Sequence, residues 1–278
     1  AEDISPMKNE VLFYPGTALT SYYHDIYKRI VTNYTHTPGQ SSRTTSYYRV
    51  DYYQNEAFKN GLDDGHSMEV VLRSNKNDGT KEYKPFSAHE QGGTGFLICT
   101  EGKNGYSACI TFLPNVSTTG SSQWIWAQSG VYPEPGRYYH VVGIWNKTEG
   151  KVYVDGMLQG TADAVGNLNH ARDGARWFAL GGDSAVGSMG NAWNGEVVLA
   201  RVFDDPLSEE QVALLYEEVK YETQTPVAFD IANLVYLGSC GIGAGYTYTI
   251  YGNGFQTGDQ VRFTSTTDLS VAFTADAK

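Results

Sequence analysis

The chain has 278 residues, with 31 Asp and Glu against 20 Lys and Arg, a net charge of −11 at pH 7, and 31 Gly and 21 Tyr. Nucleic acids and anionic membranes are bound by clustered Lys and Arg, and the sequence contains no such run, so it argues against both partners. No stretch approaches the ~20 consecutive apolar residues of a membrane-spanning helix, and the abundance of Gly and Tyr favours many short strands joined by turns.

The first 45 residues have little regular pattern. They predict a strand, then a short helix or loop around residues 23–31, then a long polar surface loop. We expect this region, residues 1–45, to pack on the domain that follows. The chain begins Ala1-Glu2-Asp3, without an initiator Met or an apolar signal core, which is typical of a processed or trimmed end.

From residue 46 onward the pattern becomes regular. Short apolar or alternating runs separated by Gly, Asn, Ser and Pro predict strands at residues 67–73, 96–99, 109–113 and 124–127. A three-residue loop between the second and third of these strands would place Cys99 opposite Cys109. The pair is then either a disulfide or two facing core thiols, and both alternatives stay open.

The middle of the chain contains the clearest hairpin signal. Residues 139–145 and 151–154 predict two strands, and Asp155-Gly156 predicts a type I′ turn into a third, because both residues tolerate positive φ. Further strands are expected at 177–182 and 196–203. Ser208 and Gln211 then form the pattern of a capping box, which predicts a helix that ends near Val219.

The composition changes again after this helix. A polar stretch at residues 223–230 predicts a linker, and residues 231–278 predict part of a small β domain, with strands at 246–251 and 260–264. Too few strands follow to close a sandwich, so we expect the chain to stop inside a longer protein. The predicted fold class is therefore all-β, an antiparallel two-sheet sandwich followed by a partial β domain.

Several sequence blocks resemble the concanavalin-like, laminin-G-like jelly rolls. They occupy residues 136–145, 152–156, 179–183, 193–196, 201–203 and 207–212. The resemblance implies a jelly roll over residues 46–222, of the kind found in large secreted bacterial proteins. It also implies a secreted, periplasmic or cell-surface location and a module without catalytic activity. Residues 248–261 resemble the opening of an immunoglobulin-like domain of the transcription-factor type, which implies such a domain at 231–278.

The resemblance raises the question of calcium. Many relatives carry Gly-x-Ile-Asp where this sequence has Gly195-Glu196-Val197-Val198, so one acidic position is missing. Asp183 and Glu196 are the side chains that would still offer oxygen ligands, whereas Ca²⁺ takes six to eight oxygens. A calcium site at these residues and a module without calcium are both compatible with the sequence.

Catalytic patterns are incomplete. Glycosidases of this fold carry their carboxylates as Glu-x-Asp-x-Glu on one strand, and the sequence contains no such triplet. The runs Asp64-Gly65-His66, Gly182-Asp183 and Gly190-Asn191 imitate a metallophosphoesterase, but His170 is the last histidine and cannot complete two metal centres. His140, within an apolar strand, is interpreted as a structural histidine.

Aromatic side chains are the best candidates for ligand contact, because they stack on sugars and pack on peptides. Trp124 and Trp126 stand two residues apart, so a strand would point both to one face, and Trp193 lies in a glycine-rich segment. Trp145 and Trp177 are expected in the core.

These residues lead to a preferred interpretation and two alternatives. The preferred one is a carbohydrate-binding or adhesion module whose partner is a glycan or a surface protein. The first alternative is a structural or protein-interaction spacer that accompanies a catalytic domain, such as a phosphoesterase or glycosidase, elsewhere in the natural chain. The second is a concanavalin-fold glycoside hydrolase.

Overall fold

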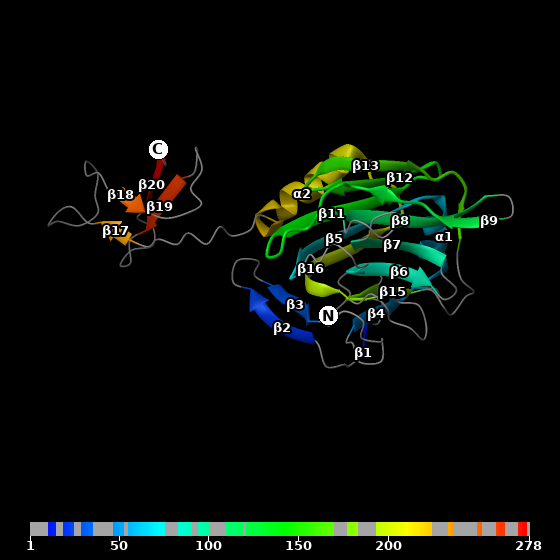
Figure 1. The fold of residues 1–278 in the computed structure, drawn as a ribbon, viewed down its shortest axis with the longest axis horizontal. Coiled ribbons are helices and arrows are strands. Elements are labelled where there is room, and N and C mark those ends of the chain that lie inside the picture. The colour runs from blue at the N-terminus through cyan, green and yellow to red at the C-terminus, as the bar shows by residue number, and fades with distance from the viewer. Residues whose placement is uncertain are drawn as a thin grey trace. The chain divides into compact units, whose positions relative to one another are not determined.

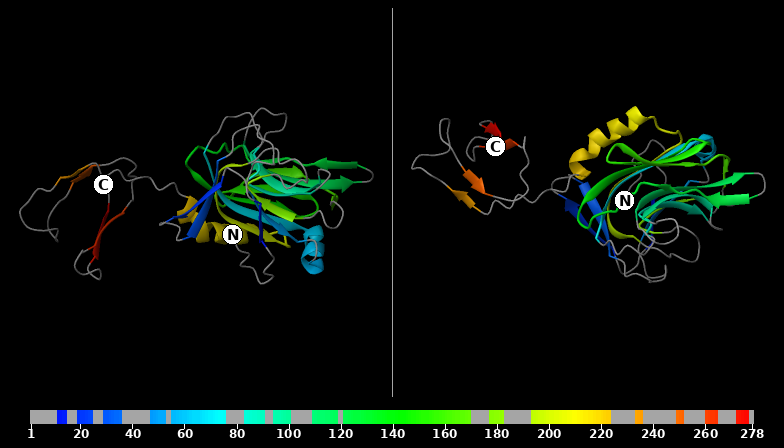
Figure 2. Two further views of the ribbon diagram at one scale, coloured as in Figure 1. Left: turned by 90° about the horizontal axis from the view of Figure 1, so that it is seen from below. Right: turned by 45° about the horizontal axis from the view of Figure 1, so that its top comes forward.

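A computed structural model of the chain divides into two units, residues 1–224 and 225–278 (Figure 1). Its described residues are 11–14, 19–24, 29–35, 47–52, 55–75, 83–90, 94–100, 109–118, 121–169, 177–182, 193–223, 233–235, 249–251, 260–264 and 272–276. In the first unit two antiparallel sheets lie face to face (Figures 1 and 2), which confirms the predicted all-β sandwich.

One sheet has seven strands. In spatial order they are β13 (Met157–Asp163), β12 (Glu149–Val154), β11 (Tyr138–Trp145), β5 (His66–Ser74), β16 (Asn194–Phe203), β3 (Arg29–Thr35) and β2 (Leu19–His24). The central strand β5 pairs with β11 on one side and with β16 on the other. Because side chains alternate along a strand, Met68 and Val70 point into the core while Glu69 lies on the outer face, away from the second sheet.

The other sheet has nine strands. Its main path is β1 (Val11–Tyr14), β4 (Tyr47–Asp51), β15 (Trp177–Leu180), β6 (Phe86–Glu90), β7 (Thr94–Thr100), β8 (Ile110–Thr118) and β10 (Ala127–Gln128). Two further strands, β9 (Ser121–Trp124) and β14 (Asn167–Leu168), also pair with β8.

The main core fills the space between the two sheets. Phe96 and Phe112 of the nine-stranded sheet and Trp145 of the seven-stranded sheet are fully buried there, in one cluster. His66 joins these rings, with its imidazole 3.8 Å from the Phe96 ring centroid. Trp145 and Trp177 are both buried, as the sequence predicts.

The predicted hairpin and capping box are both present. Asp155 and Gly156 have φ values of 51° and 76°, as a type I′ turn between β12 and β13 requires. At the start of α2 (Glu209–Thr223), Ser208 N–H donates to Gln211 Oε1 at 2.8 Å and Gln211 N–H donates to Ser208 Oγ at 3.3 Å. The helix continues four residues past Val219, where the sequence places its end.

Helix α2 covers part of the outer face of the seven-stranded sheet (Figure 2). Val212 is fully buried against Val142, Ile144 and Tyr153 of β11 and β12. No helix in the described part of the chain is long and apolar enough to cross a membrane.

The N-terminal region differs from its prediction. The short helix expected around residues 23–31 is wrong at the described positions, because β2 pairs with β3 there and Tyr22 lies opposite Val31, while residues 25–28 lie outside the described residues. The reason is tertiary, since β3 also pairs with β16, which lies far along the chain. A helix that the sequence analysis missed, α1 (Glu56–Asp64), begins where Asn55 Oδ1 accepts a hydrogen bond from Phe58 N–H at 3.1 Å.

The cysteines also correct the sequence interpretation. The ladder between β7 and β8 starts with Thr100 opposite Ile110, so Cys99 faces Thr111 rather than Cys109. Both cysteines are buried and they form no disulfide with each other, so the disulfide alternative is wrong. The register places Thr111 opposite Cys99, two positions along the chain from the Cys109 that the sequence predicts there.

The second unit contains two short antiparallel pairs among its described residues. β17 (Asn233–Val235) pairs with β18 (Thr249–Tyr251), and β19 (Gln260–Thr264) pairs with β20 (Ala272–Asp276). The immunoglobulin-like assignment of residues 231–278 stays a prediction, as does the linker at 223–230, of which the structure describes only the first residue.

Candidate functional site

An extended segment, residues 121–128, runs along β8 at the margin of the nine-stranded sheet. It contains β9 and β10, which have one continuous register with β8. Between the two strands, Ile125 N–H donates to the Pro114 carbonyl at 3.0 Å. Pro114 has no N–H with which to return the bond, and this explains why the ladder is interrupted within a segment that stays extended.

Trp124 and Trp126 lie on the outer face of the nine-stranded sheet, the face turned away from the core. Both are half-buried, and Ile125 between them packs in the opposite direction, against the main core. The apolar base beneath the two indoles consists of Leu97, Cys99 and Leu113. The predicted common orientation is therefore confirmed, and ligand contact by these two residues stays a prediction.

Gln128 is the next side chain on this face. Its Nε2 donates to Cys109 Sγ at 3.7 Å, and Thr111 Oγ1 lies 3.5 Å from the same sulfur. We refer to Trp124, Trp126 and Gln128 as the tryptophan row. The row presents two aromatic surfaces and one amide side by side, a combination suited to a ligand with both apolar faces and hydroxyl groups.

Trp193, the third predicted ligand-binding residue, is fully buried in the main core. Its Nε1 donates to the Glu196 carbonyl at 3.3 Å. A Cβ on Gly195 would lie 2.8 Å from the indole, so the absent side chain at Gly195 makes room for the ring. The prediction that Trp193 contacts a ligand is wrong, because this ring serves as core.

The predicted calcium ligands do not form a site that the structure describes. Glu196 is buried, and its two carboxylate oxygens accept hydrogen bonds from Arg73 and from the Tyr138 hydroxyl. Both oxygens are engaged by protein donors, which argues against a metal at Glu196, and calcium binding at this residue stays a prediction. Asp183 lies outside the described residues, within which no three His, Cys, Asp or Glu side chains gather as a metal site.

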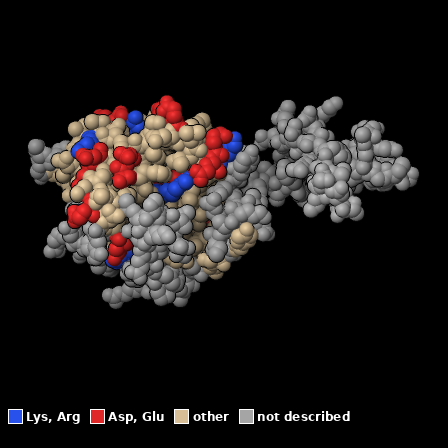
Figure 3. All heavy atoms as spheres, turned by 180° about the vertical axis from the view of Figure 1, so that it is seen from behind, with Lys and Arg blue, Asp and Glu red and all other residues tan. Residues whose placement is uncertain are grey.

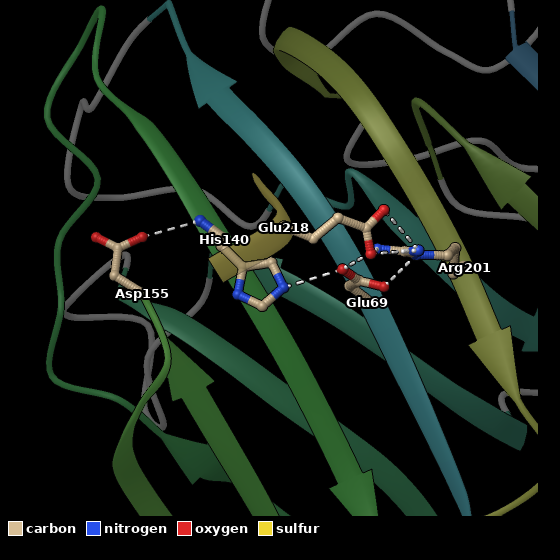
Figure 4. A network of polar contacts seen from close by, with 5 residues as sticks. All are labelled: Glu69, His140, Asp155, Arg201 and Glu218. Atoms are coloured by element: carbon tan, nitrogen blue, oxygen red, sulfur yellow. Dashed lines mark hydrogen bonds and ion pairs between the residues drawn. The ribbon is translucent and has the colours of Figure 1, made fainter. Parts of the chain in front are cut away.

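A charged network lies on the outer face of the seven-stranded sheet (Figure 4). The fully buried Glu69 accepts a hydrogen bond from His140 Nε2 at 3.0 Å and another from Arg201 Nη2 at 2.9 Å. Arg201 also contacts both carboxylate oxygens of Glu218, on α2, at 3.3 Å. The network thus connects three neighbouring strands, β11, β5 and β16, to the helix.

Electrostatics keep the centre of this network ionised. Burial alone would raise the pKa of Glu69, but hydrogen bonds from His140 and Arg201 and the charge of Arg201 outweigh it, so the pKa lies below its usual value. Burial likewise opposes the charge of Arg201, yet the hydrogen bonds and charge of Glu69 raise the pKa of the guanidinium. A carboxylate held in its charged form by two donors is suited to fixing the helix, not to proton transfer.

His140 behaves as the structural histidine that the sequence predicts. It is 1% exposed, with Nε2 bonded to Glu69 and its ring centroid 5.8 Å from that of Tyr216 on α2. Its backbone N–H donates to Asp155 Oδ1 at 3.0 Å.

At Asp155, burial and the neighbouring groups shift the pKa of the carboxyl in opposite directions, and the net effect can be tested. Burial raises the pKa of its carboxyl, although the His140 N–H and the charge of Arg137 act in the opposite direction. A raised pKa means that the ionised form reduces stability above that pKa. Asp155→Asn should therefore maintain or raise the melting temperature at pH 7, and this benefit should shrink as the pH falls through the carboxyl pKa.

The matched variant for this comparison is Asp155→Ala. Alanine loses the acceptor for His140 N–H and tolerates positive φ poorly, so its unfolding free energy should fall by about 1 to 2 kcal/mol at either pH. Equal losses for the Asn and Ala variants at pH 7 would contradict the burial argument. Thermal melts at pH 7 and pH 3 give the melting temperatures of the wild type, Asp155→Asn and Asp155→Ala.

The sequence analysis did not single out Glu69 or Arg201. Each is a charged residue inside a mostly apolar strand, and such a residue must find a partner when it is buried. The partners are 132 positions apart in the chain, and only the register between β5 and β16 brings them together.

Comparisons with known proteins place this geometry in a family. No curated protein matches the chain in sequence at a significant level. The botulinum neurotoxin DC binding domain in complex with rat synaptotagmin II has a TM-score of 0.54 and 14% identity, over 78% of this chain and 49% of that one. The same binding domain in complex with SialylT gives 0.52 and 15%, over 79% and 49%.

At these identities the likeness concerns the fold, and the matched region spans about half the length of those structures. A family model described as the concanavalin A-like lectin/glucanases superfamily matches residues 43–213, well over half of the chain. The family model and the two-sheet sandwich agree, and the chain belongs to the concanavalin A-like lectin/glucanase superfamily.

Proposed function

We propose that the first unit is a non-catalytic carbohydrate-binding module that holds a glycan on the tryptophan row. One observation carries the proposal: two half-buried indoles share one outward face, on a firm apolar base. Indole rings stack on the apolar faces of sugars, and a neighbouring amide can bond to their hydroxyl groups. The module would act in a secreted, periplasmic or cell-surface protein.

The comparisons support a binding role at the level of the fold. The superfamily includes lectins, and the two botulinum neurotoxin structures named above are binding domains, one in complex with a protein and the other in complex with SialylT. Acidic side chains are spread over the described part of the face in Figure 3, and the net charge is −11. Both features disfavour a polyanion such as nucleic acid as the partner.

The described carboxylates support the non-catalytic part of the proposal. Glu69 and Glu196 are the buried acidic side chains of the seven-stranded sheet, and each is paired with an arginine. Glu69 is further enclosed by α2 through Arg201 and Glu218. A glycosidase needs two carboxyl groups that flank a substrate, whereas these two are committed to contacts within the protein.

Glycan binding is tested with an array of glycans, followed by calorimetry on the best hits. Trp126→Ala and Trp124→Ala should each weaken binding by about tenfold or more, which corresponds to about 1.4 kcal/mol for one lost stacking contact. The matched control is Tyr23→Ala, which removes an aromatic side chain that is 55% exposed on the seven-stranded sheet. It should leave the affinity unchanged.

Three other results would contradict parts of this proposal. An array without hits contradicts carbohydrate binding and favours a structural or protein-interaction spacer. Release of reducing sugar by the purified chain contradicts the non-catalytic assignment. Equal losses in the tryptophan variants and in Tyr23→Ala would move the site away from the row.

A further inference from the structure

We propose that the tryptophan row selects a linear oligosaccharide, which lies along residues 121–128 and is bonded at one end by Gln128. This inference rests on the proposed function and adds the ligand class and the direction in which the ligand lies. It follows from the spacing, the support and the polarity of the three side chains.

The spacing sets the size of the ligand. Residues 121–128 keep one extended register along β8, so the indoles of Trp124 and Trp126 leave the backbone two residues apart. In a strand this separation is about 6.5 to 7 Å. One pyranose ring cannot stack on two side chains at that separation, whereas successive rings of a chain can cover one indole each.

The apolar base beneath the two indoles holds them on the same face along the strand. Both pack on one apolar cluster, in which Leu97 and Cys99 come from β7 and Leu113 comes from β8. Ile125, between the indoles, is partly buried and packs against the main core on the other side of the sheet. A ligand therefore meets two aromatic surfaces that already lie along the strand, and little side-chain freedom is lost on binding.

The row has one polar end. Gln128 Nε2 donates to Cys109 Sγ at 3.7 Å, and a thiol sulfur is a weak acceptor. The amide can exchange this contact for a sugar hydroxyl at small cost. At the other end, Asn115 faces Trp124 but is 2% exposed, and its Oδ1 accepts from Asn169 Nδ2 at 2.9 Å. Among the described residues of this surface, Gln128 is thus the amide that can recognise a ligand.

The test is a chain-length series of the glycan type found on the array, from monosaccharide to trisaccharide, measured by calorimetry. The trisaccharide should bind at least about tenfold more tightly than the monosaccharide. Trp124→Ala should abolish that gain and leave the monosaccharide affinity nearly unchanged. If Trp124→Ala lowers the melting temperature, Trp124→Phe keeps a smaller ring on the same base and should lose part of the gain.

The role of Gln128 has a matched control on the same segment. Gln128→Ala should weaken trisaccharide binding by about threefold to tenfold, the value of one hydrogen bond. Gln123→Ala removes the same side chain from an exposed position of β9 that alternates with Trp124. It should have no effect on binding or on melting temperature.

The outcomes separate this inference from the proposed function. A monosaccharide that binds as tightly as the trisaccharide, or equal effects of the two glutamine variants, would overturn the linear-ligand inference while glycan binding stands. Wild-type protein that binds no glycan would overturn both.

Discussion

Replacing Glu69 with alanine should lower the free energy of unfolding by about 3 to 5 kcal/mol, as expected when one partner of a buried ion pair is removed. Glu69 is fully buried and accepts hydrogen bonds from His140 and Arg201. Without its carboxylate, the Arg201 charge faces a void beneath α2, and the desolvated donors lose their acceptor. Urea unfolding of the two proteins measures the difference.

The matched control removes the other carboxylate that Arg201 contacts. Glu218 has a side chain that is 57% exposed, so Glu218→Gln should cost less than about 1 kcal/mol. If the Glu218 and Glu69 variants lose similar stability, the network is a surface feature and its centre is not Glu69.

The Glu69 carboxylate also predicts that the stability of the protein depends on pH. Because the pKa of folded Glu69 is lowered, its contribution is fully present above the ordinary carboxyl pKa and disappears as the pH falls through the folded pKa. Glu69→Gln lacks this titration. The stability difference between wild type and Glu69→Gln should therefore shrink between neutral and strongly acidic pH.

Gly143→Ala should destabilise the sandwich by about 1 to 3 kcal/mol through overpacking. A Cβ at this position of β11 would lie 2.2 Å from Phe112 Cδ2 and 2.9 Å from Phe112 Cβ, across the core. The ring cannot swing aside without displacing its neighbours in the main cluster. The absence of a side chain at Gly143 therefore leaves the space that Phe112 of the opposite sheet occupies.

Gly150→Ala, in the neighbouring strand β12, is the control. The nearest atom to its added Cβ would be Pro114 Cγ at 3.5 Å, an ordinary contact, so this variant should be neutral or slightly stabilising. Combining Gly143→Ala with Phe112→Leu should recover part of the loss, as a double-mutant cycle would measure. Additive losses in the double variant would show that the clash with Phe112 is not the cause.

Local signals made most of the first unit predictable. Asp155-Gly156 specified the hairpin between β12 and β13, and Ser208 with Gln211 specified the start of α2, because in each case the necessary atoms lie within a few residues. The failures have long-range causes. β3 is held as a strand by its pairing with β16, a partner far along the chain that a local reading of residues 29–35 does not reveal.

The candidate site was predictable to a smaller extent. The spacing of Trp124 and Trp126 correctly gave their common face, but an indole in the sequence does not reveal what covers it, and Trp193 is core. Glu196 appeared to be a free oxygen ligand because the sequence does not show Arg73 across the ladder. Burial and cross-strand pairing depend on register, which the whole sheet determines.

The position of α2 has a practical consequence for any attachment of this domain. The helix lies on the outer face of the seven-stranded sheet, whereas the tryptophan row lies on the outer face of the nine-stranded sheet. The described chain of the first unit therefore ends, at Thr223, in a helix on the face opposite the row. Immobilising the first unit through that end would leave the tryptophan row facing the solution.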